Sequence, residues 1–337
     1  MTAPVAAEGT TALADTAGTS SGVAADLKQV EEMLERLLAP GGGRRAPELG
    51  RGLALAGGKR LRPRLFLLAF RSLSPAAPTL PVYRLAAALE LLHLATLAHD
   101  DVIDGATVRR GHPSLNAAQG ERAAVLVGDF FFSQFLTAAA PSGPRALNLM
   151  AGAITAMVEG ELEQAEHRFD VNLSEEGYYS IIGKKTAGFL AAACELGALA
   201  ARAGRAAHSI YRRFGLYLGY AFQIQDDILD YVGDPHRLGK PRGSDLAQGV
   251  ITLPLIQALK TGRQAPRLRA LLTTPPLEPG DAAAIRAAVE SCGGIAYARA
   301  RADEFCEHAL AELAKLPPSP TRMELEGLVQ ALRGRQC

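Results

Sequence analysis

Apolar residues recur at helical spacing along most of the chain. The first stripe holds Leu27, Val30, Met33, Leu34 and Leu37. This is the spacing of the buried face of an α-helix, and the stripe ends before a Pro and three Gly that break the helix. Helix-compatible runs rich in Leu and Ala follow at 61–75, 81–104, 115–138, 144–167, 174–203, 206–232, 247–262, 281–316 and 320–334. Because period-2 runs of β-branched residues are absent, the sequence predicts an all-α fold, a single large helical bundle.

The same pattern predicts the domain organisation. Residues 1–24 are rich in Ala, Thr, Ser and Gly without apolar periodicity, and we expect a disordered N-terminal tail there. A length of 337 residues would fit about two domains. The composition and the helical pattern do not change along residues 25–337, however, so we expect one all-helical domain there.

Composition excludes several classes of function. The 36 basic and 35 acidic residues leave a net charge of +1, so no global attraction to nucleic acid follows. None of the four Cys forms a Cys-x-x-Cys pair, which argues against a zinc site or a redox dithiol. Neither an uncharged apolar run of about 18 residues nor a secretory signal is present. We therefore expect a cytoplasmic protein without a membrane-spanning helix.

Two motifs of the form Asp-Asp-x-x-Asp close long apolar runs. Their members are Asp100, Asp101 and Asp104, and then Asp226, Asp227 and Asp230. Residues i and i+4 share a helix face, and like charges there destabilise the helix by about 0.2–0.5 kcal/mol per pair. A cation between the carboxylates reverses that sign, and hard oxygen ligands suit Mg²⁺. One motif alone would be read as a solvated helix end, but two copies favour metal binding.

Basic residues cluster beside glycines and near both acidic motifs. The segment 57–64 begins with two Gly and carries Lys59, Arg60, Arg62 and Arg64. Further cations are Arg109, Arg110, Lys184, Lys185 and Lys240. Each alone is more often a solvated surface charge. Together with the carboxylates they indicate Mg²⁺–diphosphate chemistry, because cations bind the phosphate oxygens that the metal leaves open.

These motifs resemble the trans-prenyltransferases, the isoprenyl (polyprenyl) diphosphate synthase family. The matching segments are 57–63, 93–111, 127–129, 159–161, 185–186, 222–230 and 239–254. The resemblance is strongest to bacterial long-chain synthases of the heptaprenyl type. It implies a helical bundle around a deep central cavity, a homodimer, and condensation of isopentenyl diphosphate with an allylic diphosphate primer. A long-chain all-trans product would then be released towards the membrane.

The resemblance also assigns roles to individual residues. Asp100 and Asp104, with Asp226 opposite and Asp227 and Asp230 in support, would hold about three Mg²⁺ on the allylic diphosphate. The same diphosphate would be bound by Arg109, Lys185 and Lys240. The diphosphate of isopentenyl diphosphate would be bound by Lys59, Arg62, His93 and Arg110. Thr186 and Gln223 resemble residues that line the reacting carbons, and all six Asp of the two motifs, Asp101 included, are candidate catalytic residues.

Product length is predicted from the residues before the first acidic motif. Ala95 and Thr96 lie just over one helical turn before Asp100, where bulky aromatics in this family resemble a floor that stops chain growth. The next turn offers Leu91 and Leu92, which are smaller than Phe. We therefore expect products of about 30 to 40 carbons, because the cavity is not filled at this depth.

One segment departs from the family pattern. Gln248, Gly249 and Val250 stand where the family usually has an acidic residue, Gly and Lys, so a Lys that often helps to hold the allylic diphosphate is absent.

Several alternative functions remain open at this point. They are a shorter-chain farnesyl or geranylgeranyl diphosphate synthase, a subunit of a heteromeric synthase, a terpene cyclase and a Mg²⁺ phosphohydrolase. The absence of Trp disfavours a cyclase, whose pocket usually needs aromatics to stabilise cations. A phosphohydrolase leaves the second basic site unexplained, and a non-catalytic subunit would be expected to lose the acidic motifs.

Overall fold

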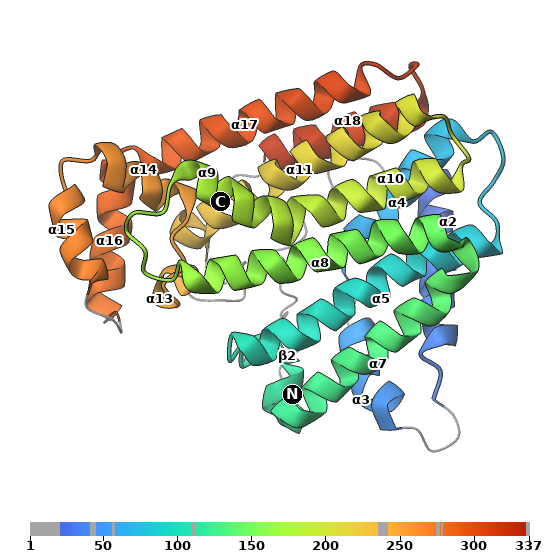
Figure 1. Cartoon of the computed structure of the whole chain (residues 1–337), viewed down its shortest axis with the longest axis horizontal. Helices are drawn as coiled ribbons and strands as arrows, with labels where there is room; N and C mark the ends of the chain where they lie inside the picture. Colours follow the sequence, from blue (N-terminus) through green and yellow to red (C-terminus); the bar gives the residue numbers. More distant parts are fainter. Residues whose placement is uncertain are drawn as a thin grey trace, which may run out of the picture. The chain divides into compact units, whose positions relative to one another are not determined.

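The computed structural model describes residues 21–40, 45–55, 58–109, 112–234, 242–273, 277 and 279–334, and these are predominantly helical (Figure 1). In chain order the longer helices are α2 (Ser21–Leu37), α3 (Arg45–Leu55), α4 (Leu61–Leu73), α5 (Leu80–Ile103), α7 (Glu121–Ala139), α8 (Pro144–Glu166), α9 (Glu175–Ile182), α10 (Gly188–Ala200), α11 (Arg205–Val232), α14 (Leu253–Thr261), α15 (Ala265–Leu272), α16 (Pro279–Ser291), α17 (Gly294–Leu313) and α18 (Pro320–Arg333). Shorter elements are α6 (Leu115–Gln119), η2 (Ala140–Ser142), η3 (Gly183–Ala187), α13 (Ser244–Ala247) and the antiparallel strands β1 (Val108–Arg109) and β2 (His112–Pro113). The prediction of an all-α fold is confirmed.

Several predicted runs are divided in the structure by single residues. The run at 115–138 breaks at Gly120, whose φ of 85° separates α6 from α7. The run at 281–316 breaks at Gly293, which precedes α17 with a φ of 77°. Both are left-handed values that L-residues with a side chain avoid. The pattern also missed α3, and α2 begins at Ser21, inside the predicted tail; residues 1–20 of that tail lie outside the described residues.

Contacts divide the chain into two compact units, each assembled from separate parts of the sequence. The first is Met1–Met150, Ala193–Ser209 and Pro318–Leu325. The second is Ala151–Ala192, Ile210–Pro317 and Glu326–Cys337. Each unit is described by itself below. The single domain and the central cavity stay predictions.

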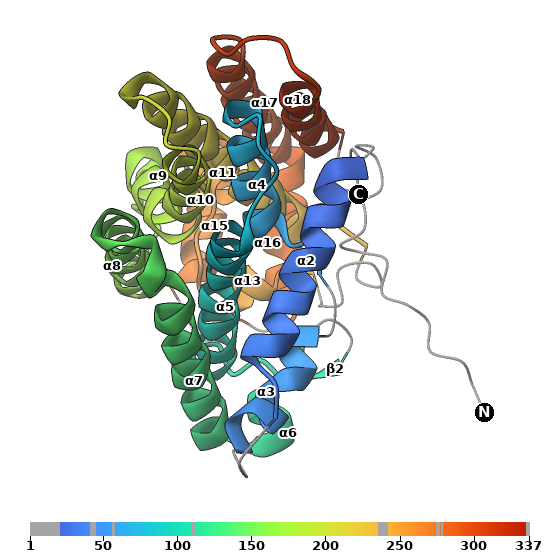
Figure 2. The same ribbon diagram turned by 90° about the vertical axis from the view of Figure 1, so that its right-hand side faces the viewer.

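Helix α5 forms the core of the first unit. It packs against α2, α4 and α7, and Figure 2 shows α2 crossing the α4 and α5 side of this unit. Four consecutive residues, Leu89 to Leu92, are each no more than 2% exposed, so α5 is buried around its whole circumference in this part, as expected for a core helix. Its last turn carries the first acidic motif and reaches solvent.

Within the residues that the structure describes, two helical stretches are long and apolar enough to cross a membrane, judged by length and composition alone. They are Leu80–Ile103 and Glu121–Ser142, whose most apolar windows are 61% and 39% buried inside the structure. Buried core helices pass the same test, and α5 owes its composition to its core position. The lower burial of the second stretch reflects an exposed apolar face on α7, which includes Val125, Leu126 and Leu136.

Helix α14 forms the corresponding centre of the second unit. It packs against α9, α15, α16 and α17, and Figure 1 shows α14 beside α15 and α16. Ile224 and Ile228 of α11 are fully buried in the same apolar cluster as Leu253, Leu255 and Ile285. The burial of these two Ile fixes the rotation of α11 where it carries the second acidic motif.

Candidate active site

The first acidic motif divides between an inward and an outward set of carboxylates. Asp101 is fully buried. It accepts a hydrogen bond of 2.8 Å from Nε of Arg109 and a second from Nη2 of the same side chain. Asp100 is half-buried and Asp104, the residue that caps α5, is exposed. Asp100 and Asp104 are therefore the members of this motif that a ligand can reach, one helical turn apart.

Arg109, which is predicted to bind the allylic diphosphate, lies on strand β1 and is hydrogen-bonded to Asp101 of α5. Its side chain remains 31% exposed. The amide of Asn116 also donates to the backbone carbonyl of Asp101 at 2.9 Å, so the turn between α5 and α6 is tied to the motif. Arg110 lies outside the described residues.

The second acidic motif shows the same division on α11. Asp226 is half-buried, whereas Asp227 and Asp230 are 4% and 1% exposed. Asp230 accepts a hydrogen bond of 2.8 Å from the hydroxyl of Ser244 and one of 3.2 Å from the backbone N–H of Asp245. It therefore holds the start of α13, and Asp226 is the most accessible carboxylate of the three.

Asp227 belongs to a chain of hydrogen bonds that joins η3, α11 and α9. The Thr186 hydroxyl donates to Oε1 of Gln223 at 2.7 Å, and Nε2 of Gln223 donates to Oδ1 of Asp227 at 2.8 Å. On its other oxygen Asp227 accepts 2.6 Å from the hydroxyl of Tyr178. The structure thus brings together Thr186, Gln223 and Asp227, which the sequence had placed in one site by resemblance.

Burial and the nearby charge of Asp245 raise the pKa of Asp227 to about 8, although the hydrogen bonds from Tyr178 and Gln223 work to lower it. The folded, metal-free chain therefore holds a proton that the unfolded chain loses near pH 4. Asp227 therefore contributes stability that is fully present below about pH 4 and is lost as pH rises to about 8, and its contribution no longer changes above that window.

We expect Asp227→Asn to remove much of this pH dependence, because Asn cannot ionise. In chelator-treated protein, the free energy of unfolding of the parent should fall between pH 6 and pH 9 by on the order of 2 kcal/mol more than that of the variant. Urea unfolding at the two pH values measures this difference. Equal changes in parent and variant would show that Asp227 is ionised at both.

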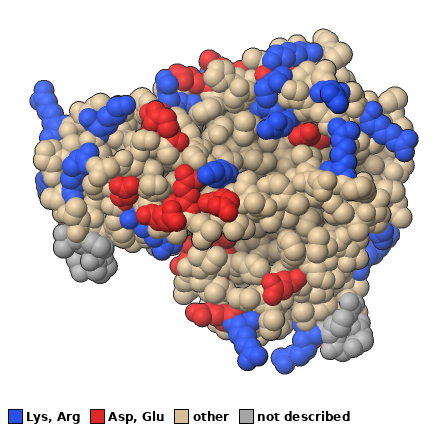
Figure 3. Space-filling view, viewed as in Figure 1, with Lys and Arg blue, Asp and Glu red and all other residues tan. Residues whose placement is uncertain are grey.

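Lys184 and Lys185 lie on a π-helical turn, η3, between α9 and α10. Lys184 Nζ lies 2.6 Å from Glu163, and Lys185 Nζ lies 2.6 Å from Glu161 and also donates to Gln164. These acidic partners belong to α8, and Figure 3 shows acidic side chains gathered with basic ones over the region where α8 ends. π-turns inside helices are frequent at functional sites, and this one carries both Lys185 and Thr186.

A close approach at Gly183 fixes the start of this turn. A Cβ added to Gly183 would lie 2.5 Å from the hydroxyl oxygen of Tyr220, which is too close for any larger residue without movement. The tyrosine ring itself stacks on Phe305, with 4.8 Å between centroids. Gly183 is therefore required by packing, and the glycine beside the Lys pair has a structural explanation.

The basic segment 57–64, which leads into the first turn of α4, carries two kinds of cation. Arg60 and Arg64 are buried, in ion pairs with Glu31 and Glu90 and with Glu324 respectively. Lys59 and Arg62 are half-buried. The sequence assigned only Lys59 and Arg62 to diphosphate binding, and these are the two that remain partly accessible.

Charge in this segment depends on its surroundings. Burial lowers the pKa of Arg62 to about 10, and the charges of Glu90 and Asp100 oppose that shift. Arg62 therefore stays cationic at neutral pH. His93, the third described candidate for the same substrate, is half-buried on α5. Gly57 lies outside the described residues.

The proposed chain-length residues all lie on α5 before the first motif. Leu91, Leu92 and Ala95 are at most 3% exposed. Thr96 is half-buried, and its hydroxyl donates to the carbonyl of His93 at 2.8 Å. Their depth suits the lining of an apolar channel, and their role in product length stays a prediction.

The donor chemistry at both motifs fits Mg²⁺. In the part of the chain that the structure describes, no three His, Cys, Asp or Glu side chains gather closely enough to hold a metal ion by themselves. Mg²⁺ is commonly bound by one or two carboxylates, several waters and substrate phosphates. Asp100 and Asp104 in the first unit and Asp226 in the second are carboxylates of that kind, so the donor chemistry of each motif suits a metal that arrives with a diphosphate.

Sequence reasoning missed Tyr178, Ser244 and Asp245. Tyr178 donates a hydrogen bond to Asp227, and Ser244 and the N–H of Asp245 donate to Asp230. Tyr178 lies 49 positions before Asp227, and no spacing rule connects residues so far apart. Val250 replaces the usual Lys and is half-buried, with its N–H donating to the Asp245 carbonyl at 2.9 Å. Lys240 lies outside the described residues.

Comparisons with known proteins agree on one family. The family model for polyprenyl synthetase matches residues 47–290. Heptaprenyl diphosphate synthase component 2 of Geobacillus stearothermophilus is 39% identical over 304 residues, covering 90% of this chain and 93% of that protein. Octaprenyl diphosphate synthase of Escherichia coli (strain K12) is 36% identical over 288 residues, covering 83% and 87%.

Solved structures give the same result. A polyprenyl synthase from Caulobacter crescentus CB15, complexed with calcium and isoprenyl diphosphate, matches with a TM-score of 0.87 and 33% identity, covering 99% of this chain and all of that one. Heptaprenyl diphosphate synthase from Staphylococcus aureus matches with a TM-score of 0.88 and 28% identity, covering 94% and 99%.

Proposed function

The chain belongs to the polyprenyl synthetase family and is a prenyltransferase, and from this premise we propose that it is a Mg²⁺-dependent synthase of long-chain all-trans polyprenyl diphosphates. Its substrates are isopentenyl diphosphate and an allylic diphosphate primer. The observation that carries the proposal is the division of each acidic motif. Asp101 and Asp227 are buried, whereas Asp100 and Asp226 are half-buried and Asp104 is exposed, so the last three can be reached by a ligand.

The reaction breaks the C–O bond of the allylic diphosphate, forms a C–C bond to isopentenyl diphosphate and releases a proton. When bound, Mg²⁺ supplies positive charge that neutralises the departing diphosphate. Arg109 and Lys185 add cationic charge to the same leaving group, which lowers the barrier to ionisation. An apolar channel excludes water that would quench the allylic cation.

Thr186 and Gln223 contribute oriented dipoles. Their hydrogen bond of 2.7 Å and the bond from Gln223 to Asp227 hold both side chains in one arrangement. Dipoles fixed before the reaction stabilise developing charge without a cost of reorganisation. This supports their assignment to the region of the reacting carbons.

One assay of purified protein tests the proposed function. The chain is supplied with labelled isopentenyl diphosphate, an allylic primer and Mg²⁺, and the dephosphorylated products are separated by reversed-phase chromatography. We expect linear products of about 30 to 40 carbons, on the steric argument about cavity filling. Cyclic products or phosphate release alone would contradict the proposal.

A two-component synthase is the second candidate, because one relative is named component 2 of a heptaprenyl diphosphate synthase. The presence of both acidic motifs on this chain supports chemistry by the chain itself, and we propose that it elongates without a second subunit. Turnover by the purified chain alone supports this, whereas turnover only after a cell extract is added would assign a partner.

We also propose that the active form is a homodimer joined through α7. Val125 and Leu136 are 41% and 45% exposed and, with half-buried Phe132, fall on one helix face at i, i+7 and i+11. Sedimentation velocity should find a dimer at about 10 µM, a concentration at which a nanomolar homodimer is complete. The double variant Val125→Arg, Leu136→Arg should sediment as a monomer. A parent that sediments as a monomer would contradict the proposal.

If the two substrates have separate anion sites, two lysine substitutions should each raise the KM of a different substrate. Lys59→Ala should raise KM for isopentenyl diphosphate about tenfold, and Lys240→Ala should do the same for the allylic primer. Each loses a charge-assisted hydrogen bond worth about 1.5–3 kcal/mol. Arg109→Ala is unsuitable for this comparison, because it leaves the buried Asp101 unpaired.

Steady-state kinetics with each substrate varied in turn measures the two KM values. Equal effects of both substitutions on both substrates would show that the cations do not form separate sites.

A further inference from the structure

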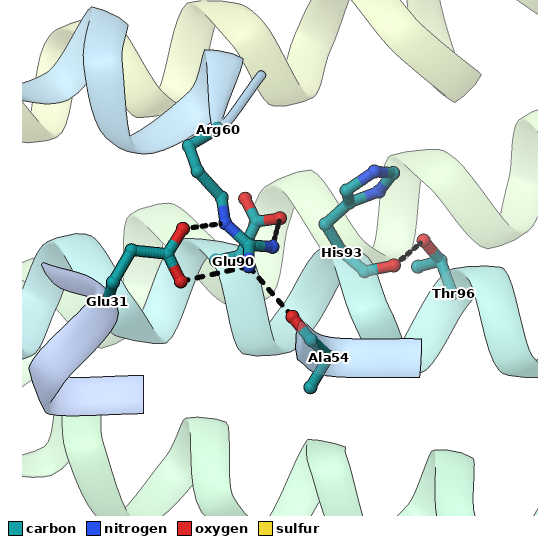
Figure 4. Close-up of polar contacts among 6 residues, drawn as sticks. All are labelled: Glu31, Ala54, Arg60, Glu90, His93 and Thr96. Carbon is teal, nitrogen blue, oxygen red and sulfur yellow. Dashed lines mark hydrogen bonds and ion pairs between the residues drawn. The ribbon is translucent and has the colours of Figure 1, made fainter. Parts of the chain in front are cut away.

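Arg60 of the basic segment donates hydrogen bonds to three different residues. Its Nε and Nη2 donate to the two oxygens of Glu31 at 2.5 and 3.0 Å, and its Nη1 donates to Glu90 at 2.8 Å. Nη2 also donates to the carbonyl of Ala54 at 2.7 Å. Figure 4 shows the guanidinium surrounded by these three acceptors. With a side chain 4% exposed, Arg60 has no surface from which to bind substrate.

The three acceptors come from three different helices. Glu31 belongs to α2, Ala54 to α3 and Glu90 to α5. Arg60 itself is the residue before α4, with φ 45° and ψ 42°. A non-glycine residue keeps this left-handed conformation only where its surroundings impose it, and here the ion pairs do so.

The position of this cluster connects it to substrate binding. Arg60 lies between Lys59 and Arg62, and its backbone conformation sets the direction in which the segment enters α4. Glu90 lies one turn before His93 on α5, as Figure 4 also shows. Contacts with α2, α3 and α5 therefore hold the segment that carries Lys59 and Arg62, and α5 is also the helix that carries His93.

We propose that Arg60, with Glu31 and Glu90, is a positioning residue that holds Lys59 and Arg62 in the geometry that binds the diphosphate of isopentenyl diphosphate. The inference rests on the proposed function. Loss of the cluster should weaken binding of this one substrate and leave the allylic primer and the chemical step nearly unchanged.

A matched ion pair elsewhere in the same unit provides the control. Asp26 on α2 pairs with Arg71 on α4, accepting from its Nε and Nη2, and also accepts 2.8 Å from the hydroxyl of Tyr83. Asp26 is 2% exposed. Asp26 thus links α2 to α4 and, through Tyr83, to α5, but it makes none of the contacts of the Arg60 cluster, so its loss reports stability alone.

The decisive comparison is Glu31→Gln against Asp26→Asn. Glu31 has a side chain 37% exposed, so its variant keeps the fold and removes one charge from the cluster. We expect Glu31→Gln to raise KM for isopentenyl diphosphate five- to twentyfold, with kcat and KM for the primer changed less than twofold. Asp26→Asn should lower the urea midpoint at least as much while leaving all three kinetic constants within twofold. Unchanged KM in Glu31→Gln, or equal KM changes in both variants, would overturn the inference.

Arg60→Lys adds a test of geometry. Lysine keeps the charge but cannot reach three acceptors with a planar fork, so KM for isopentenyl diphosphate should still rise at least threefold. Full retention of the parental KM in Arg60→Lys would contradict a positioning role. The parent enzyme is measured in the same assay. A parent that does not condense the two substrates would contradict the proposed function itself. A parent that condenses them while the variants keep its KM would contradict only the positioning role.

Discussion

Asp100→Ala and Asp226→Ala should each lower the rate of condensation by about a thousandfold or more, since each removes an accessible carboxylate from a metal site that stabilises the leaving diphosphate. Neither change should destabilise the fold. Asp100 is half-buried at the end of α5, and its removal also relieves like-charge repulsion with Asp104. Condensation rate and thermal unfolding of each variant measure the two effects.

Asp101→Ala is the matched control. Asp101 is fully buried and paired with Arg109, so its removal should lower the free energy of unfolding by about 1.5–3 kcal/mol, the loss of hydrogen bonds to a charged group. Within one motif, substitution of the outer Asp100 should thus lower the rate of condensation, whereas substitution of the inner Asp101 should lower the free energy of unfolding. Near-parental activity in Asp100→Ala or Asp226→Ala, or full activity in excess EDTA, would contradict the metal site.

Ala95→Phe should shorten the product from about 30–40 carbons to about 15–20, without abolishing the first condensation. Ala95 is 3% exposed and lies five residues, about 7.5 Å along the helix, before Asp100. A phenyl ring at this depth would fill the channel that the growing chain enters. Chromatography of the dephosphorylated products measures the distribution.

A graded series strengthens this test. Ala95→Val and Ala95→Leu should give intermediate lengths, whereas Ala86→Leu, nine residues earlier on the opposite face of α5, should leave the length unchanged. Ala86 is fully buried, so it controls for overpacking. An unchanged distribution in Ala95→Phe would show that Ala95 does not line the channel. A parent product of 15 or 20 carbons would contradict the long-chain proposal.

The sequence predicted the helices well because long apolar runs have a clear period. It could not predict the break at Gly120, because the residues on both sides are good helix formers and only the left-handed φ ends the helix. The helix α3 was missed because its 11 residues include two Gly and one Pro, which lower helix propensity.

The candidate site shows a similar limit. Four cations stand within six positions of the basic segment, and no local pattern shows which of them point inward. Their separation depends on Glu31, Glu90 and Glu324, the last of which lies 260 positions from Arg64. In the acidic motifs, spacing alone paired the first and last Asp, whereas the burial of Asp230 depends on α13.

The stoichiometry of the reaction provides the most direct test of the proposed function. Purified chain is given primer, labelled isopentenyl diphosphate and Mg²⁺, and the diphosphate released is compared with the isopentenyl units incorporated. Chain elongation predicts one diphosphate released for each unit incorporated, and no release when isopentenyl diphosphate is omitted. Diphosphate released from the primer without incorporation would contradict it.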